Sequence, residues 1–223
     1  FVASELQVAR MERLSTEARL HALRLQLDPH FLFNALNTIS SHVDRDPKLA
    51  RRMIEHLGDL LRASLDGAPE PLVPLAAELV VLDHYLAIQR IRFGDRVRIT
   101  QRIDPEAHRA LVPPLVVQPL VENAIRHGLS PRASGGTVTV TATRAGNLLR
   151  LSVEDDGVGL AVPGGAPAGV GLGLSITRQR LEGLYPGGGV SLALHSRPAG
   201  GTVAEVVVPF AEAHASALES SIA

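Results

Sequence analysis

The segment ENAIRHG, residues 122–128, places two polar residues side by side within a stretch that is otherwise apolar and helical in pattern. Asn123 and His127 are four residues apart, so on a helix they share one face. An amide oxygen is a hard ligand suited to Mg²⁺, and the carboxylate of Glu122 can orient or deprotonate a nucleophile. The segment therefore indicates a metal–phosphate site, and the alternative is a polar helix face that ends at Gly128.

A second polar segment, EDDGVGL at residues 154–160, follows an alternating run that predicts a strand. The carboxylate of Asp155, at the end of that strand, can accept a hydrogen bond from an exocyclic amine. Gly157 and Gly159 would let the backbone approach a ligand closely. The alternative is a strand that simply ends in a tight Asp-Gly turn.

The third segment is rich in glycine and reads PGGAPAGVGLGLSITRQRL at residues 163–181. Residues 163–169 carry little side-chain bulk and predict a mobile lid. Gly169, Gly171 and Gly173 then open a helix, whose first N–H groups can bind phosphate. The pattern is not a dinucleotide fingerprint, because it follows a loop and no βαβ unit surrounds it. It is not a Walker A loop, because Gly-Lys-Ser/Thr is missing.

The whole chain predicts a helical part followed by an α+β part. Residues 1–94 show helical spacing of apolar residues, and Asp46 followed by Pro47 marks a helix start. Residues 95–212 mix strand alternation with helical patterns, and residues 213–223 form a predicted tail. The expected elements are a helix reaching about residue 43, helices at 47–65 and 75–93, a strand at 96–103, a helix at 113–128, a hairpin at 137–157, a helix from about 171 and a closing hairpin at 190–210.

Composition excludes several classes of function. The chain has 223 residues and a net charge of −1, so it offers no basic field for nucleic acid or anionic membranes. The aromatic fraction of 3% also disfavours a surface that stacks bases, and no nucleic-acid partner is expected. Without cysteine the chain has neither disulfides nor thiolate metal sites. Prolines interrupt the apolar runs well before the roughly 20 residues needed to span a bilayer.

The three segments, in this order and followed by GGT at residues 200–202, resemble the GHKL (Bergerat) ATP-binding fold. Histidine kinases, type II topoisomerases, heat-shock chaperones and mismatch-repair ATPases share that fold, and the resemblance covers about residues 95–210. It implies that Asn123 ligates Mg²⁺, that Glu122 is the catalytic carboxylate and that Asp155 recognises the adenine amine of ATP. The other nucleotide-binding residues it implies are Arg126, His127, Gly157, Gly159, Gly169, Gly171, Gly173, Leu174 and Thr202.

In the helical part, QLDPHFLFNALN at residues 26–37 narrows the family. It resembles the phosphoacceptor box of LytS-type sensor histidine kinases, which has Gln, a two-residue spacer and Pro-His-Phe-Leu-x-Asn-x-Leu-Asn. Segments 71–96 and 112–128 also match that family, so the resemblance covers about residues 22–210. It implies that His30 takes the γ-phosphate of ATP and passes it to an aspartate of a response regulator.

The chemistry of the box fits this assignment. Pro29 lacks an N–H and is expected to kink the helix, which would turn His30 away from the helical bundle. A neutral imidazole is a competent nucleophile, and Asn34, one turn later, could position water for the reverse, phosphatase reaction. The alternative for His30 is an ordinary half-buried helix histidine. The family usually carries Asn where this chain has Asp28 and Asp156, and these extra carboxylates are expected to alter nucleotide affinity or the reactivity of His30.

These observations predict a two-component sensor histidine kinase. Its helical dimerisation and phosphoacceptor region would be residues 1–94, and its α/β-sandwich ATP-binding domain residues 95–212. A homodimer is expected because the apolar stripes of the helical part outnumber the partners within one chain. Since the chain begins at Phe1 and shows no signal peptide, we expect a cytoplasmic fragment of a membrane-anchored sensor. The alternatives are a GHKL ATPase that acts as a conformational switch without histidine phosphorylation, and a scaffold without catalysis.

Overall fold

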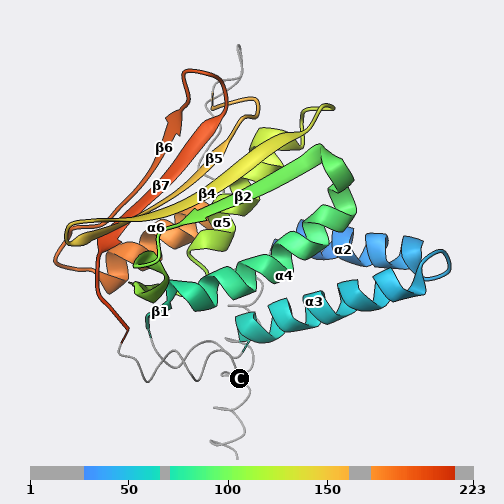
Figure 1. Ribbon diagram of the computed structural model, residues 1–223, viewed down its shortest axis with the longest axis horizontal. Helices are drawn as coiled ribbons and strands as arrows, with labels where there is room; N and C mark the ends of the chain where they lie inside the picture. Colours follow the sequence, from blue (N-terminus) through green and yellow to red (C-terminus); the bar gives the residue numbers. More distant parts are fainter. Residues whose placement is uncertain (1–27, 66–70, 161–171, 214–223) are drawn as a thin grey trace, which may run out of the picture. The chain divides into compact units, whose positions relative to one another are not determined.

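The chain divides into two compact units, one within residues 1–67 and one within residues 68–223. Figure 1 labels the described helices and strands. The computed structural model describes residues 28–65, 71–160 and 172–213. The predicted helix before residue 28, the lid at 163–169, Gly169, Gly171 and the tail after residue 213 lie outside these ranges. Helix α4, Leu75–Phe93, belongs to the unit that contains the sheet, so the compact units do not divide at the proposed functional boundary near residue 94.

In the described part of the first unit, residues 28–65, helices α2 at Pro29–His42 and α3 at Pro47–Leu65 pack against each other as a hairpin. Their buried faces consist of apolar residues at helical spacing: Phe31, Ala35 and Ile39 on α2, and Ala50, Met53, Leu57 and Leu60 on α3. The same helix α2 exposes Phe33 to 67% and Leu36 to 55%. Among the described residues, α2 therefore presents exposed apolar side chains.

Both α2 and α3 are preceded by an aspartate and have proline as their first residue. The predicted N-cap at Asp46 is confirmed, because its carboxylate accepts a 3.0 Å hydrogen bond from the N–H of Leu49. Asp28 caps α2 in the same way, in an extended conformation, and accepts from the N–H of His30 at 2.9 Å. The predicted kink at Pro29 is wrong. Pro29 is the first residue of α2, where a missing N–H costs nothing, so the proline begins a helix and does not bend one.

The second unit is built on a mixed five-stranded sheet with the order β2-β4-β5-β7-β6. Only β2 and β4 pair in parallel, and the other neighbours are antiparallel. The predicted strand and both predicted hairpins are confirmed. The strands are β2 at Val97–Ile103, β4 at Gly136–Ala145, β5 at Leu148–Asp155, β6 at Ser191–Ser196 and β7 at Thr202–Pro209.

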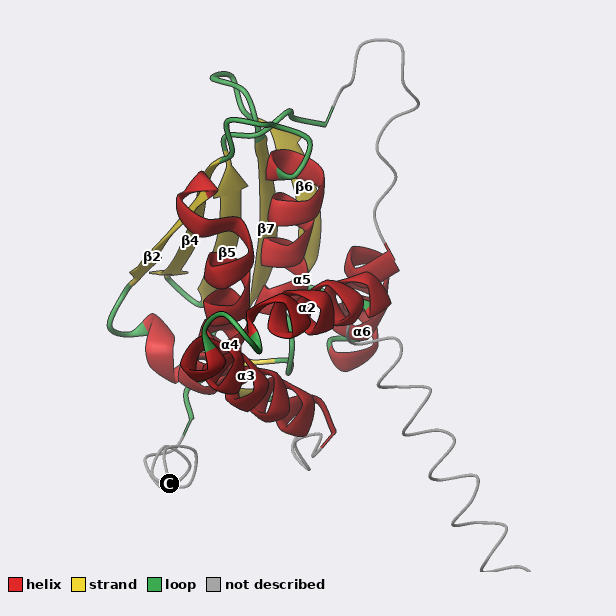
Figure 2. Cartoon of the chain, turned by 90° about the vertical axis from the view of Figure 1, so that its right-hand side faces the viewer, coloured by secondary structure: helices red, strands yellow, loops and turns green. Residues whose placement is uncertain are grey.

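Alternation along the central strands separates a buried face of the sheet from a polar one. Val138, Val140 and Ala142 of β4 are buried, whereas the threonines between them are partly exposed. On the polar face Arg150 and Glu205 form an ion pair at 2.6 Å. Helices α5 (Val117–Asn123) and α6 (Leu172–Leu184) pack on the other face, and α4 packs against α5 (Figure 2). The result is the predicted two-layer α/β sandwich.

Short elements connect the sheet and helices. A two-stranded sheet pairs β1 (Val73–Pro74) with β3 (Leu111–Val112) at the start of α4. Single turns of 3₁₀-helix occur at η1 (Gly94–Arg96) and η2 (Ala107–Arg109). Helix α4 ends at Phe93, as predicted, with Gly94 as its C-cap residue.

The helix predicted at 113–128 differs in both its start and its end. It begins at Val117, because two prolines at 113 and 114 precede Leu115, whose φ of 54° is not helical. After Asn123 the chain continues as a π-helical turn, η3, at Ala124–Leu129. Such a turn interrupts regular α-helical bonding and occurs frequently at functional sites.

Candidate functional site

Asp155, at the end of β5, is a buried carboxylate in the second unit. It is only 2% exposed, and its Oδ1 atom accepts a 2.9 Å hydrogen bond from the N–H of Gly157. Burial raises the pKa of Asp155, and the neighbouring negative charge of Asp156 adds to this. Backbone hydrogen bonds from Gly157 and Thr202 and the positive charge of Arg197 oppose the increase in pKa.

Glycines from three separate segments lie so close to Asp155 or to one another that none of them could carry a side chain without a shift. A Cβ atom on Gly128 would lie 2.5 Å from Oδ1 of Asp155. A Cβ on Gly157 would lie 2.2 Å from the carbonyl oxygen of Gly128, and one on Gly201 would lie 1.9 Å from the carbonyl oxygen of Asp155. The N–H of Val158 also donates to the Gly128 carbonyl at 3.1 Å. The structure thus brings ENAIRHG, EDDGVGL and GGT together around one buried acid.

The predicted catalytic and metal-binding pair lies at the end of α5. Glu122 and Asn123 are half-buried there, immediately before the π-helical turn, while Arg126 and His127 within the turn are exposed. The turn packs against β4, β5 and β7. This packing holds the end of α5 at the same side of the sheet as Asp155, on the face that the helices cover.

The described part of the glycine-rich segment, from residue 172 onward, forms the start of α6. Gly173 is exposed, and a Cβ on it would lie 3.6 Å from the Cβ of Pro119 on α5. Leu174 is buried at 1% exposure, and the hydroxyl of Thr177 donates to the Gly173 carbonyl at 2.9 Å. The distance between Gly173 and Pro119 shows that the first turn of α6 lies beside α5. Thr202 is the first residue of β7 and is buried.

Asp156 is one of the two departures from the family pattern. Its oxygen atoms accept hydrogen bonds from other residues of the protein. Its Oδ1 atom accepts a 2.7 Å hydrogen bond from the N–H of Thr137 on β4. Its carbonyl oxygen accepts from Arg132. The extra carboxylate is thus held toward the edge of β4, and its effect on Asp155 is through charge.

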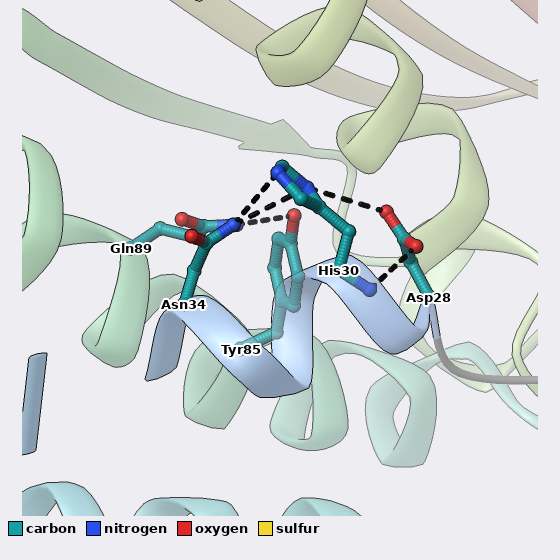
Figure 3. Close-up of polar contacts among 5 residues, drawn as sticks. All are labelled: Asp28, His30, Asn34, Tyr85 and Gln89. Carbon is teal, nitrogen blue, oxygen red and sulfur yellow. Dashed lines mark hydrogen bonds and ion pairs between the residues drawn. The ribbon is translucent and has the colours of Figure 1, made fainter. Parts of the chain in front are cut away.

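In the first unit, His30 is exposed and yet positioned by two neighbours on α2 (Figure 3). Its side chain is 61% accessible, and Nδ1 lies 3.9 Å from Oδ2 of Asp28. The amide nitrogen of Asn34 lies 3.2 Å from Nδ1 and 3.1 Å from Nε2 of the same ring. Because a neutral imidazole accepts through one nitrogen only, Asn34 donates to whichever nitrogen lacks the proton. Figure 3 also draws a pair from α4 of the second unit, Gln89 and Tyr85, joined by a 2.6 Å hydrogen bond.

Three residues of the second unit escaped the sequence reasoning. Gly128 was interpreted as a helix end, but its contact is with Asp155. Arg197 donates to the Asp155 carbonyl at 2.9 Å. Glu78 on α4 is 4% exposed, and the available signal was a charged residue between Leu75 and Leu79 in an otherwise apolar stretch.

Two family models match the chain, one over its helical part and one over its α/β part. A model of the family described as "Histidine kinase" matches residues 18–97. A second model, "Histidine kinase-, DNA gyrase B-, and HSP90-like ATPase", matches residues 113–212. Within the described residues, no helix is both long and apolar enough to cross a membrane.

Relatives with curated names point in the same direction. Sensor histidine kinase YpdA of Escherichia coli is 39% identical over 162 residues, which are 71% of this chain and 28% of that protein. Sensor protein LytS of Staphylococcus haemolyticus is 35% identical over 205 residues, which are 86% of this chain and 35% of that protein. The chain thus spans about a third of the length of these relatives. The solved histidine kinase domain of the Erythrobacter litoralis EL346 blue-light activated kinase is 22% identical with a TM-score of 0.49, covering 88% of this chain and 93% of that one.

The fold and the converging motifs define the second unit as an ATPase domain of the class shared by histidine kinases, DNA gyrase B and HSP90. ATP is the nucleotide that this class implies. Because family models match both the helical part and the α/β part, the chain belongs to the sensor histidine kinase family and is of the LytS type.

Proposed function

We propose that this chain is the kinase region of a two-component sensor and that it transfers the γ-phosphoryl group of ATP to His30. The observation that carries the proposal is the arrangement of His30, whose imidazole is 61% accessible but lies beside both Asp28 and Asn34. A histidine that served packing would be buried, and one that served solubility would need no such neighbours. The phosphoryl group would then pass to an aspartate of a response regulator.

The neighbours of His30 favour one ring nitrogen as the nucleophile. The carboxylate of Asp28 lies on the Nδ1 side, at 3.9 Å, and favours a proton on that nitrogen. The lone pair of Nε2 would then attack the γ-phosphorus, the bond to the β–γ bridging oxygen would break, and ADP would leave. Asp28 would stabilise the positive charge that develops on the ring. Asn34, whose amide lies beside the ring nitrogens, would position a water molecule for the reverse reaction.

In the second unit, Asp155 is proposed to accept a hydrogen bond from the amine of adenine. This role is supported by the backbone hydrogen bonds from Gly157 and Thr202, which hold the carboxylate in one orientation. The close contact between Gly128 and Gly157 would form a wall of bare backbone against which a flat base fits. Gly159 has a φ of 82° and lies beside Gly201 in the same region.

The phosphate end of the nucleotide is proposed to lie at α5 and the start of α6. The amide oxygen of Asn123 suits Mg²⁺, which is usually bound by one or two protein oxygens together with phosphates and water. The ion would neutralise charge between the phosphates. Glu122 is the proposed catalytic carboxylate, with Arg126 and His127 as exposed contacts to the nucleotide. Gly173 and Leu174 would border the triphosphate, together with Gly169 and Gly171.

Wider proposals concern the assembly, the partners, the location and the domain boundary of the protein. The exposed apolar residues of α2, among them Phe33 and Leu36, support a homodimer through the helical region. The whole protein is proposed to act with a response regulator and with a sensor region that precedes this chain, and to place the kinase region in the cytoplasm. The boundary between the phosphoacceptor and catalytic regions is proposed near residue 94.

Radiolabelled ATP with Mg²⁺ tests the proposal directly. The wild-type chain should acquire an acid-labile, base-stable label, and His30→Gln should abolish it. His42→Gln is the matched control, because His42 lies on the same helix and bonds only nearby hydroxyl and backbone groups in the described structure. Release of phosphate without a labelled protein would contradict the proposal and favour an ATPase, and the absence of both activities would favour a scaffold.

A further inference from the structure

Two charged side chains are withdrawn from solvent in the second unit, although the proposed chemistry does not use them. Glu78 of α4 is 4% exposed, and the guanidinium of Arg180 on α6 is partly buried, with its Nε atom fully covered. Removing a charge from water is costly unless it is paired or hydrogen-bonded. The contacts of these two residues therefore indicate what they do.

Both side chains meet at the backbone of Leu115. The Oε1 atom of Glu78 accepts a 2.6 Å hydrogen bond from the N–H of Leu115, and Oε2 accepts a 2.9 Å bond from the N–H of Val116. The Nη2 group of Arg180 donates a 3.0 Å hydrogen bond to the carbonyl of Leu115. Helices α4 and α6 thus hold opposite sides of one residue. We call Glu78, Leu115 and Arg180 the Leu115 bracket.

Leu115 has a backbone conformation that needs support. Its φ of 54° is the only positive value at a non-glycine residue among the described residues. Residues with a Cβ atom rarely adopt it, because the Cβ then lies too close to the following carbonyl oxygen. Such a conformation persists only where the surrounding structure imposes it. The two hydrogen bonds at Leu115 are that constraint.

The bracket also completes the start of α5. Val116, the N-cap residue, makes no side-chain cap of its own, and the first N–H groups of a helix need acceptors. Glu78 supplies one carboxylate for Leu115, Val116 and Val117. Burial raises the pKa of Glu78, while these N–H groups and Arg180 oppose that increase. Because both carboxylate oxygens accept N–H bonds, the geometry fits the ionised form.

The elements that meet at the bracket are those that carry the nucleotide residues. Helix α5 ends at Glu122 and Asn123, and the first turn of α6 contains Gly173 and Leu174. Arg180 lies two turns further along α6 and reaches back to the start of α5. Figure 2 shows α4, α5 and α6 on the same side of the sheet. A shift at Leu115 would therefore move α5 relative to α6.

We infer that Glu78 and Arg180 are positioning residues for phosphoryl transfer, which act by holding Leu115 and thereby fixing the helix that carries Glu122 and Asn123 against α6. The inference rests on the proposed function for the roles of Glu122 and Asn123. Neither bracket side chain needs to touch ATP. Their effect is on where the reacting groups lie, and small displacements of such groups slow a reaction strongly.

Hydrogen–deuterium exchange of the full chain tests the bracket without requiring activity. In Glu78→Gln one carboxylate oxygen becomes an NH₂ group that faces a backbone N–H, so the amides at 115–117 should exchange about tenfold faster or more. Strands β4 and β5 should keep their protection. Glu182→Gln is the matched control, because Glu182 is exposed on α6, and it should change neither region. Unchanged exchange at 115–117 in Glu78→Gln would overturn the inference.

Kinetics then test positioning against mere stability. At a temperature where circular dichroism shows both proteins folded, the rate of His30 labelling at saturating ATP should fall about 10- to 100-fold in Glu78→Gln. KM for ATP should change less than about threefold, because the base-binding residues are untouched. Arg180→Lys keeps the charge and one donor and should give an intermediate rate. A rate that falls only in proportion to the folded fraction, or a change in KM alone, would overturn the inference.

The two measurements separate failure of the inference from failure of the proposed function. If the wild-type chain labels no histidine, the proposed function fails, and the exchange at 115–117 still tests the bracket. If Glu78→Gln does not fold, Arg180→Lys decides: faster exchange at 115–117 with a slower labelling rate supports the inference, and wild-type behaviour in both overturns it.

Discussion

Gly128 lies so close to Asp155 that a single added carbon atom would displace the buried carboxylate. The Cβ of an alanine at 128 would be 2.5 Å from Oδ1 and 2.6 Å from Cγ of Asp155. Gly128 belongs to the π-helical turn after Asn123, and Asp155 ends β5. This contact therefore links the helix proposed to bind the phosphates with the strand proposed to recognise adenine.

Gly128→Ala should weaken ATP binding while leaving the fold intact. The added methyl group would push Asp155 away from the position fixed by Gly157 and Thr202, so the dissociation constant should rise about tenfold or more. Isothermal titration with a non-hydrolysable ATP analogue measures the change. Gly183→Ala is the control, because a Cβ at this helical glycine meets nothing within 4 Å. The control should bind normally and gain about 0.5–1 kcal/mol of stability. Equal affinities for Gly128→Ala and wild type would contradict the prediction.

The raised pKa of Asp155 predicts a pH-dependent effect of Asp155→Asn on stability. Since burial raises the pKa, the folded chain holds the proton more tightly than the unfolded chain, whose value is about 3.9. Asp155 therefore favours folding most below that value, and its contribution declines as the pH rises through the folded pKa. Asparagine cannot ionise and keeps an acceptor for the N–H of Gly157.

The test follows melting temperatures of both proteins between pH 4 and pH 8. Asp155→Asn should gain stability relative to wild type as the pH rises, and the gain should level off above the folded pKa. Glu78, whose pKa is also raised by burial, is present in both proteins, so its effect cancels in the difference. A difference in melting temperature that does not vary with pH would show that the pKa of Asp155 is unaltered by folding.

The elements that alternation and helical spacing define were predictable from sequence. Strands β4, β5 and β7 bury every second residue, and that period is visible in the residue types alone. The helix at Leu75–Phe93 combines an apolar stripe with a terminal glycine. These features depend on local patterns and on which side of an element is apolar. No knowledge of distant partners is required for either.

The predictions that were wrong or missing concern residues whose role depends on a distant partner, or residues whose type fits two different local structures. A proline is compatible with both a helix kink and a helix start. The extended backbone of Asp28 shows that Pro29 stands at a helix start. The role of Glu78 could not be predicted, because its hydrogen-bond partner, Leu115, lies 37 residues away in the sequence. In the same way, Gly128 ends a helix pattern, and only the fold shows its contact with Asp155. The sequence shows that these residues are present, but it does not show which distant residues they contact.

Asp28 should have two separable effects, one on the helix and one on the imidazole. Asp28→Asn keeps an oxygen that can accept from the N–H of His30, so the stability of α2 should change by only a few tenths of a kcal/mol. It removes the charge 3.9 Å from Nδ1, so labelling of His30 should slow by about three- to tenfold. Asp28→Ala should lose the cap as well, at a cost of about 1 kcal/mol. Labelling rates and thermal melts distinguish the two effects, and an unchanged rate in Asp28→Asn would reduce Asp28 to a cap.

Asn34→Ala should separate the forward reaction from the reverse one. The amide of Asn34 lies 3.1–3.2 Å from the ring nitrogens of His30, where the phosphorylated aspartate of a regulator must come during transfer. An amide can donate to and accept from one water molecule, and so can position it for attack on that phosphoryl group. Labelling of His30 in Asn34→Ala should stay within about threefold of wild type, while dephosphorylation of a regulator labelled by the wild-type chain should slow about tenfold or more.

Asn37→Ala is the matched control for this variant, since Asn37 is exposed on the same helix α2. It should leave both reactions unchanged. The half-life of the label on the regulator, followed with and without each variant, gives the reverse rate. Loss of labelling in Asn34→Ala with dephosphorylation intact would assign Asn34 to orienting His30 as a nucleophile and would remove it from the reverse reaction.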